Sequence, residues 1–233
     1  MQLTFYTHGL CPYAQRVALA LQWLELPHET IEVDLSNKPS WYAQRLGTSL
    51  VPAIELDGKA HAESLDICRL LNERAGRALV AGEESSHIEH LIRRRTDIES
   101  AGWHLLGGSW SFSRKPATPA AREEWERAVG LLTESVRAHG GRYLCGDKPT
   151  LADAVIAPFV ARFELAALRV KGYDARQATP ELDAYLRALE ADEGWCATYP
   201  QREPFGDAIQ RYASLDYFDY HTASLAEPLP ASA

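Results

Sequence analysis

Cys11 stands directly before Pro12, at the point where a strand-like run over residues 3–6 gives way to a helical pattern. Proline suits the first turn of a helix, because the N–H that it lacks would have no partner there. A sulfur at that junction would face free backbone N–H groups and the positive end of the helix dipole, and both favour a thiolate. We therefore interpret Cys11 as a reactive thiol, although a single cysteine is more often a small buried apolar residue. The side chain of Arg16 could add positive charge or could point to solvent.

Two further features of the chain each allow two interpretations. Pro52 after Val51 could be a trans proline that begins an edge strand, or a cis proline that leaves the Val51 N–H and C=O free for an extended, peptide-like ligand. Ser64 could simply cap a helix, or its hydroxyl could bind a carboxylate at the helix N-terminus while Glu63 receives an ammonium group. A ligand with an amino-acid end, a peptide-like middle and a thiol would satisfy all three features. Glutathione is such a molecule.

The first 80 residues predict the elements that would position these side chains. Strand-like runs at residues 3–6 and 30–35 flank a helix that starts at Pro12, and the second run alternates strictly between apolar and polar residues. Asp57-Gly58 is a strong signal of a two-residue hairpin, and another helix follows it. The order β-α-β, then β-β-α, predicts a small mixed sheet with helices packed on it.

The rest of the chain has a helical pattern. Ser86 with Glu89, and Thr150 with Asp153, resemble capping boxes at the start of two helices. The run that begins at Thr150 is apolar almost all round, which indicates a central buried helix. The fold class that we expect is therefore α/β plus all-α. Its predicted division has three parts: an α/β domain over residues 1–80, an all-helical domain over residues 86–220 and a flexible tail over residues 221–233.

The composition argues against several classes of function. The chain of 233 residues has a net charge of −8, so we expect it to bind no nucleic acid and no anionic membrane. It has no apolar run of about 18 residues, and its first residues lead straight into a strand. We therefore expect no stable membrane insertion and a cytoplasmic location. The four cysteines form no Cys-x-x-Cys or Cys/His pair, which argues against a metal site: Cys11, Cys68, Cys145 and Cys196.

The motifs "CPYAQRV", "LVPAIE" and "ES", in this order and spacing, resemble the thioredoxin-like domain of cytosolic glutathione transferases. The cysteine, with "NKPSWY" between the first two motifs, most resembles the omega and lambda classes and the related dehydroascorbate reductases. "TLADAVIAPFVARFE" resembles the central helix of the family's C-terminal domain. The resemblance covers roughly residues 1–200, and its motifs are specific in combination rather than singly.

The resemblance implies that Cys11 is the catalytic thiol and that glutathione is the co-substrate, with no metal. It also implies a glutathione site of five residues: Val51 and cis Pro52 at the cysteinyl backbone, Glu63 and Ser64 at the γ-glutamyl end, and Lys38 at the glycyl carboxylate. Lys38 could equally be a solvated loop residue.

A pocket for the second substrate is expected between the domains, lined by the helix from Ile88 onward. Trp103, Trp110 and Phe112 are its candidate residues, although aromatic side chains at such positions are more often part of a core. The glycine-rich segment 105–113 and the aromatic run 212–220 depart from the family pattern, and their roles stay open.

The residue at position 14 bears on the type of reaction. Glutaredoxins resemble this motif but carry a second cysteine where this chain has Ala14. Without that thiol, Cys11 would form a mixed disulfide with glutathione, and a second glutathione would release it. We therefore expect deglutathionylation, or reduction of a disulfide or of dehydroascorbate. Tyr6 offers a hydroxyl alternative, as in the transferases that use tyrosine or serine, but we interpret it as strand packing.

Two alternatives of the same fold remain open at this point. The first is a conjugating or isomerising transferase in which Cys11 is incidental, and the second is a non-catalytic carrier of small ligands. The expected partners are glutathione and a small hydrophobic, disulfide or glutathionylated substrate. Most members of the superfamily are dimers and some cysteine-type members are monomers, so a homodimer is one of two expected states.

Overall fold

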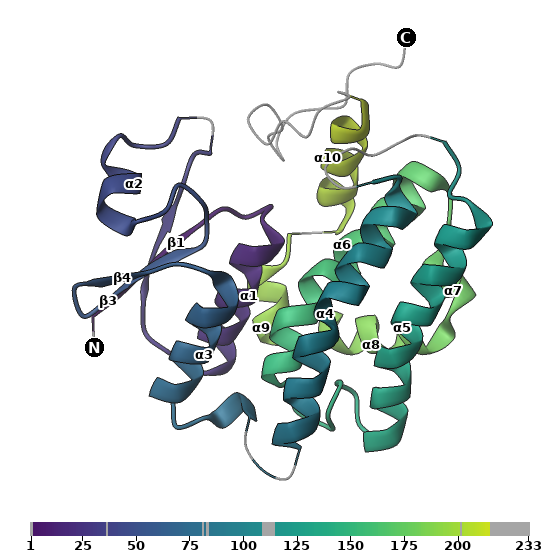
Figure 1. Ribbon diagram of the computed structural model, residues 1–233, viewed down its shortest axis with the longest axis horizontal. Helices are drawn as coiled ribbons and strands as arrows, with labels where there is room; N and C mark the ends of the chain where they lie inside the picture. Colours follow the sequence, from purple (N-terminus) through teal and green to yellow (C-terminus); the bar gives the residue numbers. More distant parts are fainter. Residues whose placement is uncertain are drawn as a thin grey trace.

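The computed structural model describes residues 2–35, 37–80, 82, 84–108, 115–200 and 202–214, except for the side chains of 204, 208 and 211–214. An α/β part and a larger helical part lie side by side (Figure 1). The α/β plus all-α class expected from the sequence is confirmed. The expected tail, 221–233, lies outside the described residues.

The α/β part is built on a four-stranded sheet in the order β2-β1-β3-β4. β1 pairs in parallel with β2 and antiparallel with β3, which in turn pairs antiparallel with β4. The α/β elements are β1 (Leu3–Thr7), α1 (Pro12–Trp23), β2 (Glu29–Glu32), α2 (Trp41–Leu46), β3 (Ala53–Leu56), β4 (Lys59–His61) and α3 (Ser64–Arg74). β2 is shorter than the predicted run 30–35, but the Val33 N–H still donates to Thr7 O at 2.8 Å.

Alternation along β1 decides which helix covers which face of the sheet. Leu3 and Phe5 belong to the large core that includes side chains of α1 and α3, whereas Tyr6 belongs to a smaller cluster with Tyr42 and Leu46 of α2. Successive strand residues point to opposite faces. α1 and α3 therefore share one face and α2 covers the other, as the ribbon shows (Figure 1).

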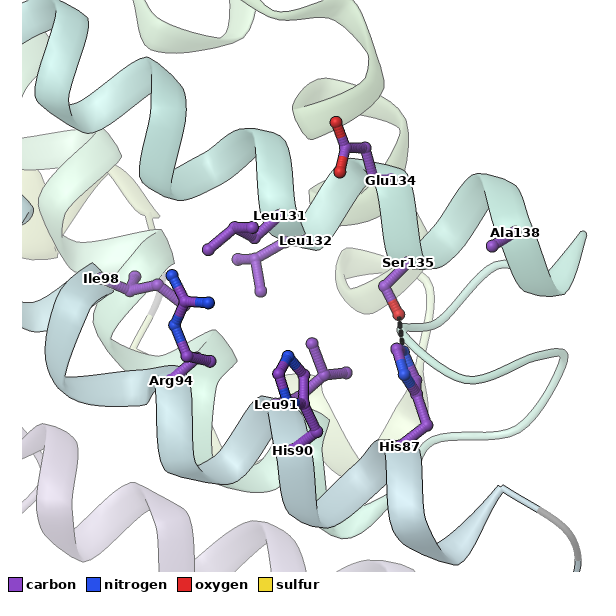
Figure 2. A pocket seen from close by; sticks show the side chains of 10 residues that line it. All are labelled: His87, His90, Leu91, Arg94, Ile98, Leu131, Leu132, Glu134, Ser135 and Ala138. Carbon is purple, nitrogen blue, oxygen red and sulfur yellow. Dashed lines mark hydrogen bonds between the residues drawn. The ribbon is translucent and has the colours of Figure 1, made fainter.

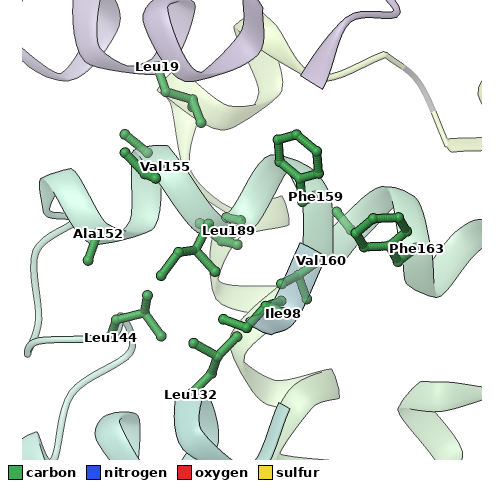
Figure 3. Close-up of a cluster of buried hydrophobic side chains, with 14 of the residues drawn as sticks. Leu19, Ile98, Leu132, Leu144, Ala152, Val155, Phe159, Val160, Phe163 and Leu189 are labelled. Atoms are coloured by element: carbon green, nitrogen blue, oxygen red, sulfur yellow. The ribbon is translucent and has the colours of Figure 1, made fainter. Parts of the chain in front are cut away.

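The helical part surrounds one central helix, α6. The elements of the helical part are the short 3₁₀ turn η1 (Ala78–Val80), α4 (Ser85–Leu106), α5 (Pro119–His139), α6 (Leu151–Lys171), α7 (Ala175–Ala178), α8 (Pro180–Glu190), α9 (Glu193–Thr198) and α10 (Arg202–Ser214). Every residue of α6 from Leu151 to Ala167 is buried. Figure 3 shows why, because side chains of α1, α4, α5 and α8 meet those of α6 from different directions.

The predicted capping box at the start of α6 is confirmed. Both oxygens of Asp153 are used: one accepts from the Thr150 N–H and hydroxyl, each at 2.8 Å, and the other from Leu144 N and Tyr185 OH, each at 3.0 Å. The carboxylate is fully buried. It therefore joins the first turn of α6 to the preceding loop and to α8.

The two other predicted caps are wrong. α4 starts at Ser85 with Glu84 as its N-cap, so Ser86 and Glu89 are already helical and make no capping box. α3 starts at Ser64 itself, with Glu63 in the N-cap position. In both cases the helix begins one or two residues earlier than the pattern predicts.

Replacing Asp153 with alanine should lower the free energy of unfolding by about 3 kcal/mol or more, because it removes one side of the capping box and leaves four donors without this acceptor, two of them buried. Urea unfolding followed by circular dichroism measures this loss. The exposed Asp147→Ala variant is the matched control and should change the stability by no more than about 0.5 kcal/mol. Equal stability of the two variants would contradict this role of Asp153.

Candidate active site

Cys11 occupies the strand-to-helix junction that the sequence predicts. It is the N-cap of α1 in an extended conformation, with Pro12 as the first helical residue. The Cys11 N–H donates to His8 O at 2.9 Å, and Gln15 N–H donates to Cys11 O at 3.0 Å. These two bonds fix the turn, so the sulfur stands at the first turn of α1.

The strand register brings Val51 next to this thiol. The ladder between β1 and β3 pairs Tyr6 with Ala53, and continuing it by two residues places Val51 opposite His8. The Cys11 thiol lies 3.8 Å from Val51 O and donates to it. The Val51-Pro52 peptide bond is cis, which is the arrangement that the ligand-binding interpretation requires.

The same edge of the sheet receives Glu63 and Ser64. The ladder between β3 and β4 pairs Ile54 with His61, and continuing it by two residues places Glu63 opposite Pro52. Glu63 is exposed and has a φ of +66°, an uncommon conformation for a residue with a side chain. Ser64, the first residue of α3, is buried. Cys11, the cis proline and the N-terminus of α3 therefore meet at one edge.

The remaining predicted residues are not all placed at this edge. Lys38 lies half-exposed in the segment between β2 and α2, and its role stays a prediction. Trp103 packs against the core of the helical part, with its ring 5.0 Å from that of Phe163 in an edge-to-face contact. This position favours the core interpretation. Trp110 and Phe112 lie outside the described residues.

Tyr6 lies on the face of the sheet that α2 covers, opposite the face that packs on α1 and α3. Its hydroxyl donates to Glu55 Oε2 at 2.5 Å, and its ring packs edge-to-face on Tyr42. Burial, together with the bond to Glu55, raises the pKa of Tyr6 to about 12. A hydroxyl committed to a carboxylate in this way is poorly placed to activate a thiol, which supports the interpretation of Tyr6 as strand packing.

The ionisation of Cys11 differs from the expectation. Burial raises the pKa of the thiol, while the backbone N–H of Ala14 and the charge of Arg162 act to lower it, as do the Tyr13 N–H and Arg16. The net direction is upward. The helix N-terminus does favour the thiolate, as predicted, but burial outweighs it, and the sequence pattern carries no measure of that burial.

Two arginines complete the surroundings of Cys11. Arg16 does not point to solvent: it is 3% exposed, its Nε donates to Val155 O of α6 at 2.7 Å, and it forms an ion pair with Glu99 of α4. Arg162 of α6 donates through Nε to Leu10 O at 3.2 Å. Sequence reasoning missed Arg162, although a charged residue inside a helix that is apolar all round is itself a signal of a buried polar role.

Two surface hollows that described residues line do not include Cys11 in their lining. One, of about 230 Å³, lies between α4 and α5, with His87, His90 and Arg94 facing Leu132 and Ser135 (Figure 2). The other, of about 570 Å³, is lined by residues of α7, α8 and α9 and by the start of α10. Within the described ranges, no group of three or more metal-ligating side chains is placed to hold an ion, and no helix is long and apolar enough to cross a membrane.

Comparison with known proteins identifies the family. Residues 10–74 match the family model for the N-terminal domain of glutathione S-transferase, and residues 115–188 match the model for its C-terminal domain. The chain therefore belongs to the glutathione S-transferase family, which uses glutathione as its co-substrate, as the motifs led us to expect.

The relatives are of the cysteine type. Glutathione S-transferase DHAR2 of Arabidopsis thaliana is 26% identical over 84% of this chain and 86% of its own length. Glutathione S-transferase omega-1 of Mus musculus is 28% identical over 82% of this chain and 78% of its own. The fold also matches glutathione transferase Omega 3C of Trametes versicolor, with a TM-score of 0.76 and 24% identity over 92% and 91% of the two chains. This chain is accordingly a cysteine-type member of the superfamily.

The alkylation rate of Cys11 by iodoacetamide should keep rising about tenfold per pH unit beyond pH 8.5, the ordinary pKa of a thiol, because burial raises the pKa of this one. Peptide mass spectrometry after timed labelling measures this rate for each cysteine separately. The exposed Cys196 serves as the internal comparison. A rate that levels off near neutral pH would show instead that the helix terminus dominates.

Proposed function

We propose that this protein is a glutathione-dependent thiol transferase or reductase that works through a mixed disulfide between Cys11 and glutathione. The observation that carries the proposal is the environment of the thiol. Cys11 stands at a helix N-cap, its sulfur next to the backbone of a cis proline segment, and the residue one turn further on is a fully buried alanine, Ala14. No second sulfur on the first turn of α1 can resolve a disulfide, so glutathione supplies the resolving thiol.

The proposed steps balance as two thiol–disulfide exchanges. The Cys11 thiolate attacks the glutathionyl sulfur of a mixed disulfide, so that a Cys11–glutathione disulfide forms and the substrate leaves as a thiol that takes up a proton. The thiolate of a second glutathione then attacks this disulfide, releasing glutathione disulfide and restoring Cys11. With dehydroascorbate as the acceptor, the Cys11 thiol and one glutathione thiol supply two electrons and two protons. Ascorbate forms, the same Cys11–glutathione disulfide remains, and a second glutathione releases it as before. The names of the relatives, which include a DHAR and omega transferases, support this class of reaction.

Five residues are proposed to hold glutathione. An extended cysteinyl backbone would pair with Val51 next to Pro52, beyond the last pair of the ladder between β1 and β3. The exposed Glu63 and the N-terminus of α3 at Ser64 would receive the ammonium and carboxylate of the γ-glutamyl end. Lys38 would reach the glycyl carboxylate.

The contact between Cys11 and Val51 links binding to reactivity. The thiol donates to Val51 O, and a hydrogen bond given by the neutral form disfavours ionisation. A ligand whose N–H pairs with the same carbonyl would compete for this acceptor. Binding of glutathione would therefore remove one of the contacts that keep the thiol protonated.

Replacing Cys11 with serine should reduce glutathione-dependent reduction of hydroxyethyl disulfide and of dehydroascorbate by at least about 100-fold, because a hydroxyl cannot form the mixed disulfide. Coupled NADPH oxidation through glutathione reductase, and ascorbate absorbance, measure the two activities. The Cys196→Ser variant should keep both within about twofold, since that surface change leaves Cys11 untouched. Undiminished reduction by the Cys11→Ser variant would exclude the thiol mechanism. A gain of conjugating activity in that variant would support the division in which a hydroxyl at this place serves conjugation and the Cys11 thiol serves reduction.

An Ala14→Cys variant tests the role of the missing second thiol. Treated with glutathione disulfide, the wild-type protein should gain one glutathionyl group on Cys11. The variant should instead close a disulfide between positions 11 and 14, which are spaced as in a Cys-x-x-Cys motif. Intact-protein mass spectrometry separates a glutathionyl gain from the loss of two hydrogens. The same variant carrying Cys11→Ser is the control, and a stable glutathione adduct on Cys11 of the single variant would contradict the argument from Ala14.

A further inference from the structure

Arg162 crosses from the helical part to the segment that carries the reactive thiol. It is 8% exposed, and its Nε donates to the carbonyl of Leu10, the residue directly before Cys11, at 3.2 Å. Its Nη1 donates to Gln15 Oε1 in the first turn of α1 and, at 3.0 Å, to Pro158 O of its own helix. One guanidinium thus ties α6 to the backbone before Cys11 and to the Gln15 side chain after it.

Two aromatic rings, one directly after α9 and one on α10, hold this guanidinium in place. Its central carbon lies 5.4 Å from the ring centre of Tyr199 and 5.2 Å from that of Phe205. These distances are in the range of cation–π contacts, which favour a fixed position of the cation. Phe205 is buried on α10. Arg162 is therefore restrained by three different elements and is not a freely moving surface cation.

The charged and titratable groups around Cys11 come from three helices. Tyr13 and Arg16 belong to α1, Tyr42 to α2 and Arg162 to α6. Arg16 is directed away from the thiol loop, toward Val155 O and the carboxylate of Glu99. Arg162 is the cation that reaches the carbonyl next to Cys11.

We propose that Arg162 is a positioning residue for Cys11, which orients the thiol by holding the Leu10 carbonyl and favours the thiolate with its charge. Its meaning for turnover rests on the proposed function, but its effect on the thiol does not. A positive charge near a thiol stabilises the ionised form, and the charge of Arg162 acts to lower the pKa of Cys11 against the effect of burial.

Two variants separate the charge from the geometry. Arg162→Gln removes the charge, and Arg162→Lys keeps it while losing the fork that binds two acceptors at once. At pH 8, alkylation of Cys11 by iodoacetamide should be about tenfold slower in the glutamine variant than in the wild type, and the lysine variant should lie between them. Turnover should fall in both variants through kcat, with the KM for glutathione changed by less than about twofold, because Arg162 acts on the thiol and not on the bound tripeptide.

The matched control is Arg169→Gln, which changes another arginine of α6, one paired with Glu203. It should leave the alkylation rate of Cys11 within about twofold of the wild type. Circular dichroism and urea unfolding establish which variants are folded, and the lysine variant keeps the comparison with the wild type open if the glutamine variant does not fold.

The outcomes that overturn the proposal differ from those that overturn the proposed function. A folded Arg162→Gln variant with the wild-type alkylation profile would refute the role of Arg162, even if its turnover were lower. A lysine variant that alkylates as fast as the wild type, or no faster than a folded glutamine variant, would refute it too. Reduction that survives in Cys11→Ser would refute the proposed function alone, and the alkylation rates would still decide the role of Arg162.

Discussion

The structure depends on the buried carboxylate of Asp153, which fixes where α6 begins. A helix that is apolar on all sides has no polar face to set its rotation or its start, so these must come from its ends. Here one side chain accepts four hydrogen bonds, from the helix's own cap, from Leu144 and from Tyr185 of α8. That start sets which side chains of α6 meet α1 and α4.

The reactive thiol depends on the same helix, although it lies in the other part of the chain. The Val155 carbonyl of α6 accepts a hydrogen bond from Arg16, and Arg162 of α6 donates one to the Leu10 carbonyl. Arg16 thus bonds α1 to the second turn of α6, and Arg162 bonds the middle of α6 to the residue before Cys11. Since these contacts are directional, the orientation of Cys11 is set jointly by its own strand–helix junction and by a helix more than a hundred residues further along the chain.

Local patterns in the sequence predicted those features of the fold and site that depend only on residues close together in the chain. The strand-like run over residues 3–6, the cysteine and proline at the start of α1, and the Thr150–Asp153 box each involve groups within a few residues of one another. The partner of Arg16 could not be found in this way, because Glu99 lies on a helix of the other part. The net ionisation of Cys11 was missed for a related reason: the pattern shows the helix terminus, but the burial that opposes it arises from packing. The box predicted at Ser86 failed because capping residues also occur inside helices, where their side chains have other partners.

The contacts of α10 bear on where the folded unit ends. The match to the family's C-terminal domain stops at residue 188, yet Glu164, fully buried in α6, accepts two hydrogen bonds from Arg202 at 2.8 and 2.7 Å. A chain cut after residue 188 would bury that carboxylate with Arg176 as its remaining cation and would strip Phe205 from Arg162. The matched span therefore leaves out side chains of α10 that contact α6, and a shortened version would lose part of the surroundings of its own thiol.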